Sequence, residues 1–61
     1  MINVIICDDN PNDKKKVITI VNEFMYKNKL EYKIHDFNDY DKKFYSVIEN
    51  KMPNKIYLLD I

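Results

Sequence analysis

Two apolar segments of the 61-residue chain each end in aspartate. Asp8 and Asp9 follow residues 2–7, and Asp60 follows residues 56–59. Carboxylates that share one cleft repel one another and lose hydration, so at neutral pH they need either a proton or a hard cation. Oxygen ligands without His or Cys favour Mg²⁺ or Ca²⁺, and a shallow cleft that keeps several waters favours Mg²⁺. Beside such an ion, a carboxylate can attack the phosphorus of a phosphoryl group.

The pattern of apolar residues predicts three strands. Residues 2–7 and 56–59 are nearly continuous apolar runs, which are typical of strands inside a parallel sheet. Residues 32–37 are more polar and favour a strand at a sheet edge. The two segments between these strands are long enough for crossover helices. We therefore expect parallel strands in an α/β fold of β-α-β-α-β order.

Capping signals locate the two helices. Asn10 can cap a helix over residues 11–27, and Pro11 suits the first helical position. The expected apolar stripe of this helix consists of Val17, Ile18, Val21, Phe24 and Met25. A second helix is expected over residues 39–49, after cap candidates at Asn38 and Asp39. Its expected apolar side consists of Tyr40, Phe44, Val47 and Ile48.

The order of the strands decides whether the acids meet. In a sheet of order 2-1-3 the first and third strands are neighbours, and ligands bind outside their carboxyl ends. Asp8, Asp9 and Asp60 would then converge there from opposite ends of the chain. The structural alternative is that these aspartates only end strands and begin loops.

Two motifs carry a resemblance to a known family. They are VIICDDN at residues 4–10, before Pro11, and IYLLDI at residues 56–61. Both are similar to segments of the CheY-like receiver domain of two-component response regulators. The resemblance covers the whole chain but about half of a receiver, so it implies a partial receiver domain over residues 1–61. It also implies a β-α-β-α-β fragment of a flavodoxin-like, doubly wound parallel sheet.

The resemblance assigns roles to the matching residues. It implies that Asp60 accepts a phosphoryl group from a phosphohistidine on a sensor histidine kinase, while Asp8 and Asp9 hold Mg²⁺ directly or through water, with Asp60 as a further ligand. A receiver of this kind is a cytoplasmic, self-phosphorylating signalling domain and not a turnover enzyme. The first motif looks most like receivers with a LytTR-type DNA-binding output, which implies transcriptional control. The hydroxyl residue and lysine that receivers use for activation would lie beyond Ile61.

Composition excludes several other classes of function. The chain has no glycine, so it contains no glycine-rich phosphate-binding or dinucleotide-binding loop. Its formal net charge of zero argues against direct nucleic-acid binding by this segment. No apolar run is long enough for a membrane span, and the start of the chain has no secretory-signal pattern. The single cysteine, Cys7, fits a small buried side chain in a reducing compartment.

Two other interpretations remain. In the first, the chain is a non-catalytic interaction or assembly fragment whose acids serve capping and solubility. In the second, it belongs to the haloacid-dehalogenase phosphatases, although their motif needs a second Asp two residues after the first, beyond this chain. For either signalling or assembly, an apolar third strand at the sheet edge predicts a homo-oligomer or a strand-swapped dimer.

Overall fold

The computed structural model describes residues 1–60, and three parallel strands form its centre. The strands are β1 (Ile2–Asp8), β2 (Tyr32–Phe37) and β3 (Lys55–Asp60). Helix α1 (Pro11–Lys27) connects β1 to β2, and helix α2 (Lys42–Glu49) connects β2 to β3. The strand order is β2-β1-β3, and both pairings of β1 are parallel. The structure confirms the predicted element order, the α/β class and the strand order.

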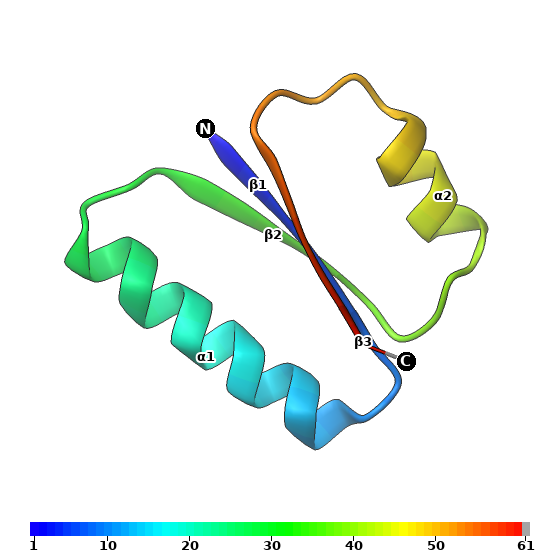
Figure 1. The fold of residues 1–61 in the computed structure, drawn as a ribbon, viewed down its shortest axis with the longest axis horizontal. Helices are drawn as coiled ribbons and strands as arrows, with labels where there is room; N and C mark the ends of the chain where they lie inside the picture. The colour runs from blue at the N-terminus through cyan, green and yellow to red at the C-terminus, as the bar shows by residue number, and fades with distance from the viewer. Residues whose placement is uncertain (61) are drawn as a thin grey trace.

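Strand β1 is the centre of two hydrophobic clusters, one on each face of the sheet. Val4 and Ile6 pack on the side of α1 with Met25. Ile5 and Cys7 pack on the other side with Phe44 of α2. Figure 1 shows the two helices on opposite sides of the three strands. The uninterrupted apolar sequence of β1 follows from this position, because neither of its faces meets water.

Helix α1 has the predicted bounds because its start is encoded locally. The side chain of Asn10 accepts hydrogen bonds from the backbone N–H groups of Asn12 and Asp13, and Pro11 occupies the first turn. Three of the expected stripe residues, Val17, Ile18 and Val21, pack against the cluster that contains the buried Met25. Phe24, the remaining residue of the expected stripe, does not pack against the sheet: it is 58% exposed.

Helix α2 begins later than predicted. Asp41 caps it by accepting a hydrogen bond from the backbone N–H of Phe44 at 2.9 Å, so the first helical residue is Lys42. The Asp39 side chain instead accepts from the N–H of Tyr40. Tyr40 therefore precedes the helix, although its ring still lies 4.9 Å from that of Phe44. Neither helix within residues 1–60 combines the length and the apolar character that a bilayer crossing requires.

The end of α1 uses a left-handed residue without glycine. Lys29 has φ 55°, the N–H of Leu30 donates to the carbonyl of Met25 at 3.0 Å, and the N–H of Lys29 donates to the carbonyl of Tyr26 at 3.1 Å. This pair of bonds is the Schellman arrangement, in which glycine is preferred at the left-handed position because it has no Cβ.

Replacing Lys29 by Gly should therefore stabilise the fold by about 1 kcal/mol. The gain comes from relief of the Cβ clash at positive φ, and urea unfolding would measure it. The matched control is Lys27→Gly in the last turn of α1, where glycine should cost about 1 kcal/mol. Equal effects of the two substitutions would contradict this account of the helix end.

A buried polar network ties β2, β1 and the segment before β3 together. His35 Nε2 lies 3.1 Å from Oδ1 of Asn3, and the Asn3 amide donates to the carbonyl of Pro53 at 2.9 Å. Asn3 is 7% exposed. Burial, and secondarily the charge of Lys33, lowers the pKa of His35 below its usual value of 6.5. Burial and the charge of Lys33 therefore favour the neutral imidazole.

The free energy of unfolding should fall as pH drops from about 7.5 to about 5. The unfolded chain binds a proton on His35 at higher pH than the folded chain does, so acid favours unfolding until the folded-state pKa is passed. Urea unfolding of the wild type and of His35→Gln across this range would measure the effect. Because carboxylates also titrate there, the His35 contribution is the difference between the two slopes. An identical pH dependence of both proteins would exclude it.

Candidate functional site

All seven aspartates of the chain lie at the carboxyl end of the sheet, which we call the carboxyl edge. Asp8 and Asp60 end β1 and β3, and Asp36 is the last residue but one of β2. The others follow these strands or begin the helices: Asp9, Asp13, Asp39 and Asp41. The three glutamates, Glu23, Glu31 and Glu49, lie elsewhere. The fold thus concentrates its shortest carboxylates where parallel α/β sheets bind ligands.

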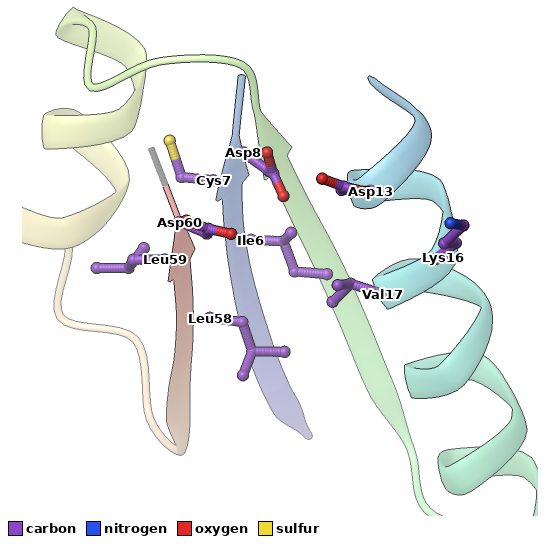
Figure 2. Close-up of a pocket in the computed structure, with 9 residues that line it drawn as sticks. All are labelled: Ile6, Cys7, Asp8, Asp13, Lys16, Val17, Leu58, Leu59 and Asp60. Carbon is purple, nitrogen blue, oxygen red and sulfur yellow. The ribbon is translucent and has the colours of Figure 1, made fainter. Parts of the chain in front are cut away.

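Asp8 and Asp60 are direct neighbours across two strands. They are register partners in the parallel β1–β3 pair, as are Ile6 and Leu58 one step earlier on the same face. Neighbouring strands lie about 4.8 Å apart. Figure 2 shows the side chains of Asp8 and Asp60 on the side of the sheet that faces α1. The predicted convergence of the first and third strands is therefore confirmed for these two acids.

The Asp8 carboxylate is held in place. The residue is only 6% exposed, and its Oδ1 accepts a hydrogen bond from the backbone N–H of Asn10 at 2.9 Å. This bond links the end of β1 to the residue that caps α1, so it fixes the position of the carboxylate relative to the loop. A carboxylate offers about four lone-pair sites, so one such bond leaves capacity for a ligand.

A pocket of about 430 Å³ opens between α1 and β3 beside these acids. Its lining consists of Ile6, Cys7, Asp8, Asp13, Lys16, Val17, Leu58, Leu59 and Asp60 (Figure 2). Asp13, an acid in the first turn of α1, lines the pocket but was not among the predicted site residues. The signal for it was available: residues 13 and 17 lie one helical turn apart, and Val17 belongs to the stripe that faces the sheet.

Asp9 is the predicted site residue that the pocket does not include. It follows β1 directly, its side chain is exposed, and it is not among the lining residues. Across residues 1–60, no three acid, histidine or cysteine side chains are close enough together to form a ready-made metal cluster. The structure therefore brings Asp8 and Asp60 together and leaves Asp9 outside the pocket lining.

Lys14 joins the opposite flank of the carboxyl edge. Its ammonium group lies 3.3 Å from Oδ2 of Asp36 and also donates to the side chain of Asn38. The first turn of α1 is thereby tied to the end of β2, and one of the acids gains a counter-ion. Sequence patterning could not reveal this pair, because its members come from two different elements.

Cys7 lies in β1 just before these acids, and its environment does not suit a reactive thiol. It is fully buried, and burial, followed by the charges of Asp39 and Asp41, raises its pKa above 9.0. A raised pKa disfavours the nucleophilic thiolate at neutral pH. The predicted role as a small buried side chain is confirmed.

A scan against protein-family models and searches of curated proteins and solved structures found no match to this chain. The receiver resemblance therefore stays a prediction that depends on the residues quoted above. The structure itself defines an α/β chain with an open three-stranded parallel sheet and an acidic pocket at the carboxyl edge.

Proposed function

We propose that the chain is the phosphoacceptor part of a receiver domain of a two-component signalling system. The observation that carries this proposal is the register pairing of Asp8 with Asp60 beside one pocket. An exposed aspartate at the end of one strand, next to the buried Asp8 on the neighbouring strand, suits phosphoryl transfer to a carboxylate. The strand order β2-β1-β3 is also the one that a flavodoxin-like, CheY-like sheet requires.

The donor set fits a hard divalent cation. Carboxylate oxygens are the preferred protein ligands of Mg²⁺, which usually keeps several of its waters. Asp8 and Asp60 would supply neighbouring carboxylates, and the exposed Asp9 would contribute directly or through water. Two or three carboxylates completed by water meet this requirement without a closed protein cage. When bound, Mg²⁺ would reduce the negative charge of the incoming phosphoryl oxygens.

Asp60 is the proposed nucleophile. One of its carboxylate oxygens would attack the phosphorus of a phosphohistidine on a sensor histidine kinase. A phosphorus–oxygen bond forms, the phosphorus–nitrogen bond breaks, and its electron pair returns to the imidazole, which takes a proton from solvent. The hydrogen bond from the N–H of Asn10 holds the Asp8 carboxylate in place. Asp8 would thereby keep the end of β1 fixed beside Asp60 and help to orient the acceptor carboxylate.

The proposed cellular setting follows from the same assignment. A receiver acts in the cytoplasm, where its partner is the kinase and its product is a phosphorylated aspartate. The output that responds would be transcriptional if the likeness to LytTR-type regulators holds. The chain would then be a self-phosphorylating switch and not a turnover enzyme.

The competing candidate is an assembly fragment without this chemistry. Two of its acids do serve local structure, because Asp8 accepts from Asn10 and Asp41 caps α2. Capping does not explain Asp60, which follows the last apolar residue of β3 and lines the pocket. The alternative therefore predicts a folded chain that does not bind Mg²⁺.

Titration with Mg²⁺ separates the two functions. We expect saturable shifts of the backbone amide resonances of Asp8, Asp9 and Asp60 in ¹H–¹⁵N spectra. Asp9→Asn should weaken binding by about tenfold or more, because it removes one anionic ligand. The matched control is Asp36→Asn, whose carboxylate lies on the other side of β1 and is paired with Lys14. Absence of saturable shifts in a sample with a dispersed, folded spectrum would refute the proposal.

A further inference from the structure

The helix side of the acidic pocket carries a third carboxylate. Asp13, in the first turn of α1, lines the pocket together with Asp8 and Asp60. Figure 2 shows its side chain pointing from α1 toward Asp8 at the end of β1. The proposed function gives roles to the two acids at the strand ends and leaves Asp13 without one.

Two hydrogen bonds fix the position of Asp13 relative to Asp8. The backbone N–H of Asn10 donates to Oδ1 of Asp8 at 2.9 Å, and the backbone N–H of Asp13 donates to Oδ1 of Asn10 at 3.2 Å. Asn10 therefore connects the buried carboxylate of Asp8 to the backbone of Asp13. Both bonds lie within residues 8–13, so the end of β1 and the start of α1 are sufficient to place the third carboxylate.

The lining of the pocket is net negative. It contains three aspartates and one lysine, Lys16. Within residues 1–60 the one ion pair joins Lys14 to Asp36, so no lysine neutralises Asp13 at contact distance. A volume of about 430 Å³ corresponds to a sphere about 9 Å across, which is close to the Debye length in physiological salt. The charge of Asp13 therefore acts on any group that enters the pocket to reach Asp60.

Phosphodonors differ in the charge that they bring to such a pocket. An acyl phosphate arrives as a dianion, and when its phosphorus–oxygen bond breaks, the electron pair leaves on an anionic carboxylate. A donor with a phosphorus–nitrogen bond, such as phosphohistidine or phosphoramidate, releases a neutral imidazole or ammonia once its nitrogen is protonated. A carboxylate in the pocket wall therefore repels an acyl phosphate and its leaving group more strongly than a phosphorus–nitrogen donor.

We propose that Asp13 makes the phosphoacceptor site selective for phosphorus–nitrogen donors over acyl phosphates. This selectivity rests on the proposed function, because it concerns transfer to Asp60. Asp13 acts through its charge and needs no contact with a cation, in keeping with the finding that no three potential ligand side chains of residues 1–60 form a metal cluster. The site then responds to a phosphohistidine on a partner protein and much less to free acyl phosphates.

A comparison of two small donors tests the role of Asp13. At saturating Mg²⁺, intact-mass spectrometry would measure the rates of phosphorylation by acetyl phosphate and by phosphoramidate. Asp13→Asn should raise the rate with acetyl phosphate about fivefold and the rate with phosphoramidate less than about twofold. The matched control is Asp39→Asn, which removes an exposed carboxylate from the loop before α2, outside the pocket lining. It should leave the ratio of the two rates unchanged.

Salt and a conservative substitution distinguish charge from structure. Raising the salt concentration should narrow the difference between the wild type and Asp13→Asn, because screening weakens the repulsion. Asp13→Glu keeps the charge and should keep the wild-type ratio of the two rates. An acid in the first turn can instead serve only the helix dipole. In that case Asp13→Asn would lower the urea midpoint without changing the ratio, and the proposal would be overturned.

Two negative results have different meanings. Phosphorylation of the wild type, with a donor ratio that is the same in Asp13→Asn, refutes the role of Asp13 and leaves Asp60 as the acceptor. No phosphorylation of the folded wild type by either donor refutes the proposed function and the donor selectivity together.

Discussion

Asp60→Asn should abolish phosphorylation of the chain by a small phosphodonor such as an acyl phosphate. The wild type should gain the mass of one phosphoryl group, and the variant should react at least about a thousandfold more slowly, because an amide cannot replace the carboxylate nucleophile. Intact-mass spectrometry after rapid acid quenching would measure both. Asparagine has nearly the same shape as aspartate, and residue 60 is exposed at the pocket, so the fold should persist.

Two controls make this result specific to Asp60. Asp36→Asn alters the carboxylate on the other side of β1 and should keep most of the reactivity, since Asp36 is paired with Lys14. Chelation of Mg²⁺ should suppress the reaction of the wild type as strongly as the Asp60 substitution does. A mass gain that survives in Asp60→Asn would assign the acceptor to another residue and contradict the proposal.

Phe44→Ala should unfold most of the protein. Phe44 is 2% exposed, packs with Ile5 and Cys7, and makes an edge-to-face contact with Phe37 at 5.4 Å between ring centroids. Removing a buried phenyl ring costs about 3 to 5 kcal/mol. The free energy of unfolding of a domain of this size is only about 3 to 9 kcal/mol, so the substitution should remove most or all of it. Urea unfolding followed by circular dichroism would show it.

Tyr45→Ala is the matched control for this substitution. Tyr45 is the next residue of α2 and also contacts the Phe44 ring, but it is 52% exposed. Its removal should therefore cost about 1 kcal/mol or less. Similar unfolding midpoints for the two variants would mean that Phe44 does not anchor α2 to the sheet.

Local signals explain how much of the fold was predictable. The start of α1 depends on the side chain of Asn10 and the ring of Pro11, both adjacent to the first turn, so the sequence places it correctly. The predicted start of α2 was wrong because the side chains of Asp39 and Asp41 can both cap a helix. Only the three-dimensional path of the chain selects Asp41 as the partner of the Phe44 N–H.

Positions that depend on how elements pack were harder to predict. The pairing of Asp8 with Asp60 followed from an assumed strand order, and the structure confirms it. The exposure of Phe24 could not be predicted from the sequence, because the rotation of α1 about its axis decides which edge of the apolar stripe contacts the sheet. The same rotation places Asp13 in the pocket. Helix orientation relative to a sheet is a tertiary property that periodicity alone does not fix.

The central position of β1 has a consequence for synthesis. β1 leaves the ribosome before both of its partners, Tyr32–Phe37 and Lys55–Asp60. Until then, its apolar side chains have no native neighbours. Contacts between residues this far apart in sequence form slowly, and a nascent chain with such an exposed segment is prone to aggregate. We therefore expect the yield of native protein to depend on chaperones that bind short extended apolar peptides during translation.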